Sequence, residues 1–149
     1  MKIGIDIGRV IIGGDGEDTF FSAKYLETPA VAGAKESLEE LWWQEHEIHL
    51  VSKCGEKVEA KTMDWLIDKE FIPSRVIPTH RIHFVRKRHL KAPMAQALEL
   101  DIFIDDRQDV LDHMVEIVPH LILFTSWEQA NTELELAFEM GRAFAASKG

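Results

Sequence analysis

The chain has few of the features that mark extracellular or membrane-bound proteins. It contains one cysteine, Cys54, in 149 residues, so an internal disulfide framework is excluded. No stretch approaches the roughly 18 consecutive apolar residues of a membrane span. The first residues have the pattern of a short strand that ends in a carboxylate, unlike the long apolar segment of a secretory signal. We therefore expect a soluble cytoplasmic protein.

The balance of charge is acidic, and apolar residues are plentiful. The formal net charge is -9, which disfavours unassisted binding to nucleic acid or to an anionic membrane. Hydrophobic residues make up 46% of the chain, which is typical of a folded protein. The length suits one domain with its own core, so we expect a single domain over residues 1–149.

Short apolar runs alternate with longer segments of helical periodicity. We expect strands at residues 2–7, 47–52, 81–85, 101–106 and 120–124, and helices at 33–46, 56–71, 92–100, 108–117 and 126–146. This alternation predicts parallel pairing, and thus an α/β fold with a doubly wound, Rossmann-like sheet of about five strands.

Polar side chains stand where three of the expected strands end. Asp6 follows the first strand, Ser52 ends the second, and Asp105 and Asp106 end the fourth. In such sheets ligands bind beyond the carboxyl ends of the strands. Three crowded carboxylates repel one another, and a bound cation relieves the repulsion. Magnesium fits best, because it prefers hard oxygen ligands.

Two further side chains extend this set toward phosphate chemistry. Ser52 can donate a hydrogen bond to a phosphate oxygen, and Lys91 stands just before the third expected helix. A carboxylate nucleophile, a magnesium ion, a hydroxyl and a lysine are suited to phosphoryl transfer. Taken singly, each residue is more often a turn, a cap or a solvated charge. Their order on successive strand ends favours the functional interpretation.

Four segments resemble the motifs of the haloacid dehalogenase superfamily. "IGIDIGRVI" resembles the first motif, in which an apolar strand ends in the nucleophilic Asp, and "IHLVS" resembles the second. Lys91 in "KAPMAQALELDIFIDDR" stands where the third motif has its Lys, and "FIDDR" resembles the acidic fourth motif. The resemblance covers nearly the whole chain. The stretch "KAPMAQALELDIFIDDRQDVL" is the most specific part, and it resembles the deoxyribonucleotidase-like branch. The lack of a large insertion after either of the first two motifs implies no sizeable cap domain.

The resemblance assigns a role to each matching residue. It implies that Asp6 is the nucleophile, which forms an aspartyl-phosphate. It implies a magnesium ion held by Asp6, the backbone carbonyl of Gly8, Asp105 and Asp106. It implies phosphate contacts from Ser52 and Lys91, with Lys87 as a weaker substitute for Lys91. We also expect substrate contacts from Lys53, which directly follows the second motif, and from Arg107, the last residue of the fourth.

Gly8 departs from the family pattern. Phosphatases of this superfamily usually carry a second Asp at this position, which protonates the leaving oxygen. General acid–base help of this kind contributes about a hundred- to ten-thousand-fold in rate. Asp15, Glu17 or Asp18 is a possible surrogate acid, although "GGDGED" is more simply a solvated acidic turn. The sequence therefore predicts a better-preserved metal and phosphate site than catalytic machinery.

Two function classes remain open. One is a magnesium-dependent phosphohydrolase that acts on a small phosphomonoester such as a nucleotide, and the other is a catalytically impaired relative that binds a phosphorylated ligand or a protein partner. "GIDIG" also resembles the start of actin-like sugar kinases, but those need two domains. The basic run at residues 81–91 either steers an anionic substrate or a nucleic-acid end into the site or is a solvated loop.

The histidines and the cysteine offer a second, weaker set of candidates. His80, His83 and His89 are close in sequence, but residues three apart on a strand point to opposite faces. His80 and His83 are therefore expected to be poor partners for one metal ion. Cys54 has no obvious paired base and is expected to be a structural or incidental cysteine.

Overall fold

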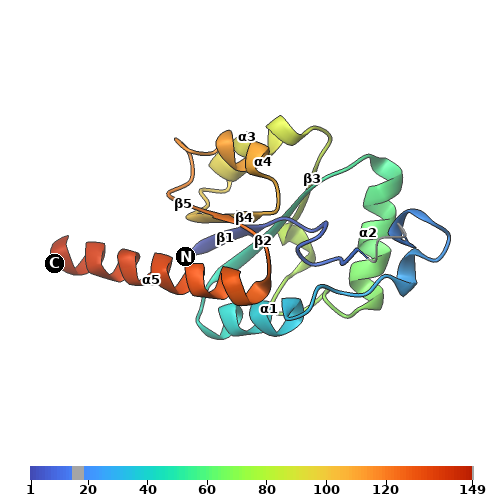
Figure 1. The fold of residues 1–149 in the computed structure, drawn as a ribbon, viewed down its shortest axis with the longest axis horizontal. Helices are drawn as coiled ribbons and strands as arrows, with labels where there is room; N and C mark the ends of the chain where they lie inside the picture. The colour runs from blue at the N-terminus through green and yellow to red at the C-terminus, as the bar shows by residue number, and fades with distance from the viewer. Residues whose placement is uncertain (15–18, 149) are drawn as a thin grey trace.

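The computed structural model of the chain describes residues 1–14 and 19–148. Its centre is a parallel sheet with the strand order β3-β2-β1-β4-β5 (Figure 1). The strands are β1 (Lys2–Ile5), β2 (Glu47–Lys53), β3 (Ile82–Val85), β4 (Ile102–Asp105) and β5 (His120–Leu123). All four pairings are parallel. This confirms the expected α/β fold with a sheet of five strands.

β1 lies at the middle of the sheet because it pairs with a strand on each side. Ile3 is opposite Ile48 of β2 and Ile102 of β4, and all three side chains are fully buried. β-branched side chains pack well in a sheet that is covered on both faces. The central position of β1 places its carboxyl end between those of β2 and β4.

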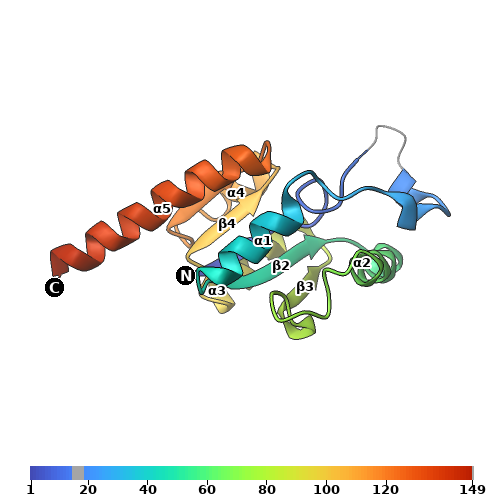
Figure 2. The same ribbon diagram turned by 90° about the horizontal axis from the view of Figure 1, so that it is seen from below.

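Helices cover both faces of the sheet. They are α1 (Ala34–Trp43), α2 (Glu56–Asp68), α3 (Lys91–Ala97), α4 (Gln108–Asp112) and α5 (Trp127–Lys148). Figures 1 and 2 show α1 and α5 on one face and α3 and α4 on the other. The fourth helix ends at Asp112, five residues before the expected end at 117. In the described part of the chain, no helix is both long and apolar enough to cross a membrane.

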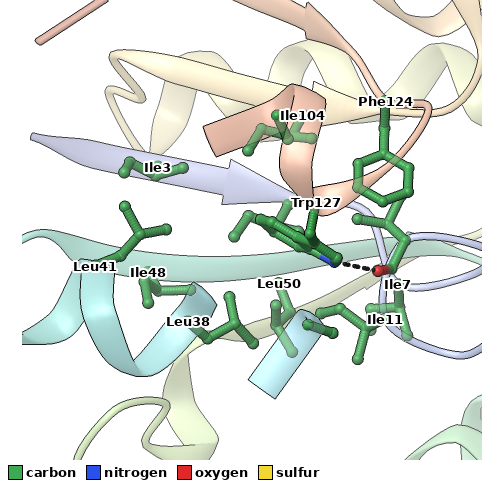
Figure 3. Close-up of a cluster of buried hydrophobic side chains, with 14 of the residues drawn as sticks. Ile3, Ile7, Ile11, Leu38, Leu41, Ile48, Leu50, Ile104, Phe124 and Trp127 are labelled. Carbon is green, nitrogen blue, oxygen red and sulfur yellow. Dashed lines mark hydrogen bonds between the residues drawn. The ribbon is translucent and has the colours of Figure 1, made fainter. Parts of the chain in front are cut away.

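The two faces of the sheet carry two cores. The larger joins β1, β2 and β4 to α1, α2 and α5, and Figure 3 shows Leu38 and Leu41 of α1 beside Ile48 of β2. Trp127 is 2% exposed, and its indole N–H donates a hydrogen bond of 2.8 Å to the carbonyl of Val10. This bond fixes the start of α5 to the loop that follows β1.

The connection between β1 and α1 contains two short 3-10 helices, η1 (Thr19–Phe21) and η2 (Tyr25–Glu27), where no regular element was expected. Three hydrogen bonds anchor it on α2, one of them from the Lys61 ammonium to the carbonyl of Ser22 at 3.2 Å. The buried indole of Trp65 donates to the carbonyl of Thr28 at 2.8 Å, and the Tyr25 hydroxyl donates to Asp64 at 2.9 Å. The proposed surrogate acids Asp15, Glu17 and Asp18 lie outside the described residues.

Candidate active site

Two adjacent strands bring the acidic residues together. β1 ends at Ile5, and the backbone N–H of Asp6 continues the pairing with β4 by donating to the carbonyl of Ile104 at 2.9 Å. β4 ends at Asp105 itself. Because neighbouring parallel strands end at the same edge of a sheet, Asp6 and Asp105 lie side by side, and Asp106 follows one residue on.

The three carboxylates form one cluster. Each of Asp6, Asp105 and Asp106 offers an oxygen, and these oxygens lie within 4.8 Å of one another. Asp105 is fully buried, Asp6 is 7% exposed, and Asp106 is half-buried. Among the described residues, this is the only group of three or more His, Cys, Asp or Glu side chains close enough to hold one metal ion.

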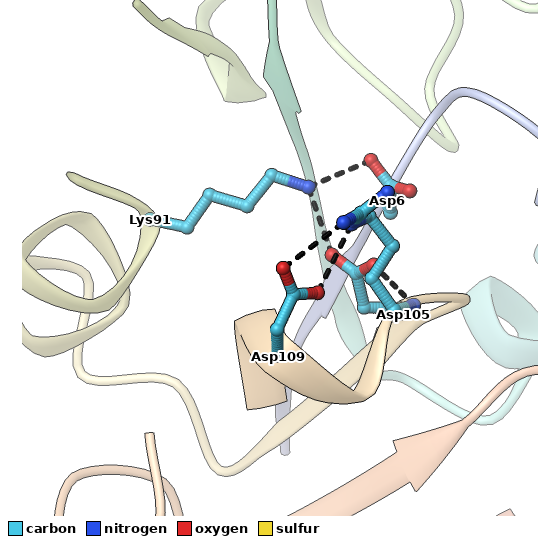
Figure 4. A network of polar contacts seen from close by, with 5 residues as sticks. Asp6, Lys91, Asp105 and Asp109 are labelled. Atoms are coloured by element: carbon cyan, nitrogen blue, oxygen red, sulfur yellow. Dashed lines mark hydrogen bonds and ion pairs between the residues drawn. The ribbon is translucent and has the colours of Figure 1, made fainter. Parts of the chain in front are cut away.

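Lys91 enters the cluster from the start of α3. Its Nζ lies 2.8 Å from Oδ1 of Asp6 and 2.8 Å from Oδ2 of Asp105, so one ammonium bridges two carboxylates (Figure 4). The Lys91 side chain is 4% exposed. A buried charge with two such partners is held in a fixed orientation. The backbone N–H of Arg107 donates to the other oxygen of Asp105 at 2.9 Å.

Burial and like charge dominate the electrostatics of this cluster. Burial raises the pKa of Asp6 to about 8, with Lys91 opposing the rise and Asp105 adding to it. Burial also raises the pKa of Asp105, against the effect of Lys91. Burial disfavours the ammonium of Lys91, but the Asp6 and Asp105 carboxylates outweigh it and raise its pKa. The positive charge of Lys91 therefore offsets only part of the cost of burying the negative charges of Asp6 and Asp105.

A cavity of about 410 Å³ adjoins the cluster at the carboxyl edge of the sheet. Gly8, Ser52 and the carboxylate Asp106 line it, whereas Asp6 and Asp105 are buried behind this lining. Phe20 and Phe21 from η1 line it as well, and Phe21 is 66% exposed. This volume lies in the range of small-molecule sites. The cavity thus combines polar groups at the strand ends with an aromatic rim.

The predicted substrate-binding residues fall into different places around this cavity. Ser52 is buried, while Lys53 and Arg107 are exposed, and all three line the cavity. The guanidinium of Arg107 makes two hydrogen bonds of 3.0 Å to the carboxylate of Asp109. Lys91 is not in the cavity lining, because its ammonium lies among the carboxylates. Their roles toward a substrate stay predictions.

Gly8 leaves space beside the carboxylates. A Cβ added at Gly8 would meet no atom within 4 Å, and the backbone there is outside the positive-φ region. Asp106 is the only carboxylate residue among the described residues that line the cavity. Within the described chain, no other acid lines the cavity that could stand in for the Asp that the resemblance expects at position 8.

The histidine pair in the structure includes a residue that sequence reasoning missed. Nδ1 of His49 on β2 lies 3.0 Å from Nε2 of His83 on β3, and Nε2 of His49 lies 2.7 Å from Glu47. Side chains at alternate positions of one strand share a face, so Glu47 and His49 were predictable neighbours. The pairing with His83 depended on the register between β2 and β3.

Cys54 lines the cavity but has the properties of an unreactive thiol. Burial is the main effect that raises the pKa of Cys54, and Glu59 adds to it. A raised pKa keeps the sulfur protonated at neutral pH, whereas a nucleophilic cysteine needs its thiolate.

Sequence reasoning also missed part of the cavity wall. Arg9, Phe20 and Phe21 line the cavity without having been predicted, whereas Arg88, which also lines it, belongs to the basic run at residues 81–91 for which substrate steering was one of the two interpretations. Arg9 directly follows Gly8 in the first motif, and this position alone indicates that it lies near the site. The two phenylalanines stand out in the sequence as an apolar pair shortly after the acidic segment "DGED". Their distance from the strand ends depends on the path of the connection between β1 and α1, which the sequence pattern does not give.

Comparison with known proteins gives one remote relative. "Putative nucleotidase OB0422" of Oceanobacillus iheyensis is 27% identical over 107 residues, a match that covers 72% of this chain and 55% of that protein. The matched part thus spans about half the length of the relative. No family model matches the chain.

Proposed function

We propose that this protein is a magnesium-dependent phosphohydrolase that acts on a small phosphomonoester through an aspartyl-phosphate on Asp6, with a rate limited by Gly8. The observation that carries this proposal is the cluster of Asp6, Asp105 and Asp106, whose oxygens lie within 4.8 Å of one another beside a cavity of about 410 Å³.

The cluster fits a hard divalent cation. Carboxylate oxygens are the ligands that magnesium prefers, and a single lysine leaves the raised pKa of Asp6 uncorrected. Asp6, Asp105, Asp106 and the backbone carbonyl of Gly8 would hold the ion. When bound, magnesium supplies positive charge that neutralises phosphate oxygens and keeps the nearby carboxylates ionised.

In the proposed reaction, each step is assigned to a side chain of the protein or to water. The Asp6 carboxylate attacks phosphorus, so an aspartate oxygen–phosphorus bond forms and the bond from phosphorus to the leaving oxygen breaks. Water then hydrolyses the acyl phosphate and restores Asp6. Lys91 orients Asp6 through its 2.8 Å contact, and Ser52 donates to a phosphate oxygen at the cavity wall.

Because Gly8 offers no acid, proton transfer to the leaving oxygen should be the slow step. Without an acid beside the site, the leaving oxygen takes its proton from water. A substrate with a good leaving group does not need that help, whereas an alkyl phosphate does. We therefore propose slow turnover of alkyl phosphates.

The remote relative supports a nucleotide as the substrate. Its name describes a nucleotidase, and the aromatic rim formed by Phe20 and Phe21 is suited to contact with a flat base. The phosphate would then lie at the strand ends and the nucleoside toward η1.

A second candidate is a catalytically impaired protein that binds a phosphorylated ligand. Gly8 favours it, because the position lacks an acid. Asp106 is the sole carboxylate residue in the described cavity lining, and it is already a ligand of the proposed metal site. In this case the metal and the phosphate bind, but the ligand is not hydrolysed.

A screen of phosphomonoesters with and without magnesium tests the proposal. Aryl phosphates, nucleoside monophosphates and sugar phosphates are each incubated with the wild type and with Asp6→Asn. Phosphate release that needs both magnesium and Asp6 supports the phosphohydrolase. Tight binding of phosphate and magnesium with no release from any substrate supports the binding protein.

A further inference from the structure

The cavity beside the carboxylates is basic, although the chain is acidic overall. Four cationic residues line it, namely Arg9, Lys53, Arg88 and Arg107. Asp106 is the only acidic residue among its described lining, and the whole chain has a net charge of -9. A local excess of one sign in a cleft concentrates ligands of the opposite sign.

Three of the four cations are free to meet a ligand. Arg107 is paired with Asp109. Arg9, Lys53 and Arg88 make no ion pair within 4.0 Å with any carboxylate of residues 1–14 and 19–148. They come from separate segments, since Arg9 follows β1, Lys53 ends β2 and Arg88 begins the short 3-10 helix Arg88–Leu90 before α3.

Arg9 is held in an unfavourable backbone conformation. Its φ is 65°, in the left-handed region that residues with a Cβ avoid. The other non-glycine residues with positive φ, Glu45, Glu70 and Glu99, each stand two positions after the last residue of a helix, where a left-handed residue is common. Arg9 instead lies in a tight turn after β1, in which its backbone N–H donates a hydrogen bond of 2.8 Å to the carbonyl of Ile12.

The backbone conformation of Arg9 and its position beside the cavity both indicate a role in ligand binding. Strained residues gather where the surrounding structure holds them for a function. The Arg9 side chain is exposed, lines the cavity and directly follows Gly8. A glycine would adopt this backbone without strain. The turn itself does not require an arginine at this position, and the exposed guanidinium is available to a ligand in the cavity.

The charges exceed what one phosphate group requires. Lys91 and a divalent cation together balance the three carboxylates of the cluster. A phosphomonoester carries close to two negative charges at neutral pH. Three free cations around the cavity thus leave positive charge unmatched when only one phosphate is present.

We propose that the cavity takes a bisphosphorylated small molecule, with one phosphate at Asp6 and a second held by Arg9, Lys53 and Arg88. This inference rests on the proposed function for the position of the first phosphate. The guanidinium of Arg9 is suited to a phosphate because it presents paired donors to two oxygens. The carbon skeleton, from a nucleoside or a sugar, lies between the two phosphates along the wall formed by η1.

Equilibrium binding tests this inference without relying on turnover. Adenosine 3′,5′-bisphosphate and adenosine 5′-monophosphate are titrated calorimetrically, with magnesium present, into Asp6→Asn, which cannot form the phosphoenzyme. Fructose 1,6-bisphosphate and fructose 6-phosphate form a second matched pair. We expect at least one bisphosphate to bind about tenfold more tightly than its monophosphate, and the pair with the larger ratio identifies the skeleton.

Variants of two arginines separate the proposed contact from general charge. Adding Arg9→Gln should bring the ratio close to one. Adding Arg86→Gln should leave it unchanged, because Arg86 is paired with Glu59 and does not line the cavity. Arg9→Gly should also remove the preference while raising the unfolding midpoint, since glycine relieves the strain.

Equal affinity for both members of each pair overturns the inference, as does a preference that survives Arg9→Gln. The two proposals can fail separately. A bisphosphate preference in binding, with no phosphate release by the wild type, supports this inference and counts against the phosphohydrolase. Magnesium-dependent phosphate release with no preference for a bisphosphate supports the phosphohydrolase and overturns this inference.

Discussion

At the scale of single residues, Gly8 is the position where one added side chain should change the chemistry most. A Cβ there meets nothing within 4 Å, so Gly8→Asp places a carboxylate near the reacting group without overpacking. We expect this variant to hydrolyse an alkyl phosphate about a hundredfold faster than the wild type, at the lower end of the acid–base range. The gain on an aryl phosphate should be smaller, because that leaving group needs little protonation. Steady-state rates on both substrates test this.

Gly14→Asp is the matched control for this variant. Gly14 also lines the cavity and also has open space around an added Cβ, but it lies farther along the chain from the carboxylates. It should not show the selective gain on the alkyl substrate. A wild type that is already fast on alkyl phosphates and is slowed by Gly8→Asp would show that another group is the acid.

Asp6 should make the metal-free protein less stable as the pH rises. Its pKa is about 8 in the folded chain, against roughly 3.9 in the unfolded chain. The folded state therefore holds this proton more tightly, and the stability that it contributes is complete below pH 4 and is lost as the pH rises toward 8. Asp6→Asn cannot ionise. Its free energy of unfolding should exceed that of the wild type at pH 8, by at least about 1 kcal/mol, and much less at pH 5.

Urea unfolding in a chelating buffer at the two pH values measures this difference. Asp109→Asn is the control, because Asp109 is exposed and its pKa is lowered, mainly by the hydrogen bond from Arg107. It should show no gain in stability between pH 5 and pH 8. If Asp6→Asn and the wild type differ equally at both pH values, Asp6 is not protonated in the folded protein.

At the scale of secondary-structure elements, the local pattern was enough to predict the strands and helices. All five expected strands form, because each is an apolar run bounded by polar residues. Where an observed strand boundary differs from the expected one, it does so by one or two residues. The end of α4 was predicted too late. Met114 and Val118 lie in the same core as α4, so burial of apolar residues alone did not mark the point where its helical turns end.

The α5 helix supports the site through Trp127. Its indole donates to the Val10 carbonyl, which belongs to the loop that follows Asp6. Trp127→Phe removes the donor and leaves that buried carbonyl unpaired, so we expect a loss of about 1 to 3 kcal/mol in the free energy of unfolding. Chemical denaturation measures it. Trp43→Phe, at a side chain that is 71% exposed, should have little effect. Equal losses in the two variants would mean that the hydrogen bond does not matter.

At the scale of the whole molecule, the site depends on strand order. Asp6 and Lys91 are 85 positions apart and their side chains lie 2.8 Å from each other, because β1 lies between β2 and β4 and α3 leads into β4. The strand-end rule predicted that Asp6, Ser52 and Asp105 would share one edge. It could not predict that Lys91 would be buried between carboxylates, or that Arg9 would adopt a left-handed backbone, since both depend on side-chain packing and loop geometry.

Magnesium should stabilise the whole fold, because the three ligands stand at the ends of two neighbouring strands, β1 and β4, and are brought together only by folding. A ligand that binds only the native state adds about 2.7 kcal/mol to the free energy of unfolding at a hundred times its dissociation constant. We expect the unfolding midpoint of the wild type and of Gly8→Ala to rise with magnesium, because residue 8 offers only its carbonyl. Asp106→Asn should lose most of this rise.

Thermal unfolding over a magnesium titration, with calorimetry for the dissociation constants, tests this expectation. Asp112→Asn is the control, since Asp112 is an acid on nearby α4 that bonds Gln108 and lies outside the three-carboxylate cluster. It should respond to magnesium like the wild type. If Asp106→Asn is stabilised as strongly as Asp112→Asn, the ion binds elsewhere. The nucleophilic role of Asp6 would then lose its electrostatic basis, because Lys91 alone leaves the Asp6 pKa at about 8.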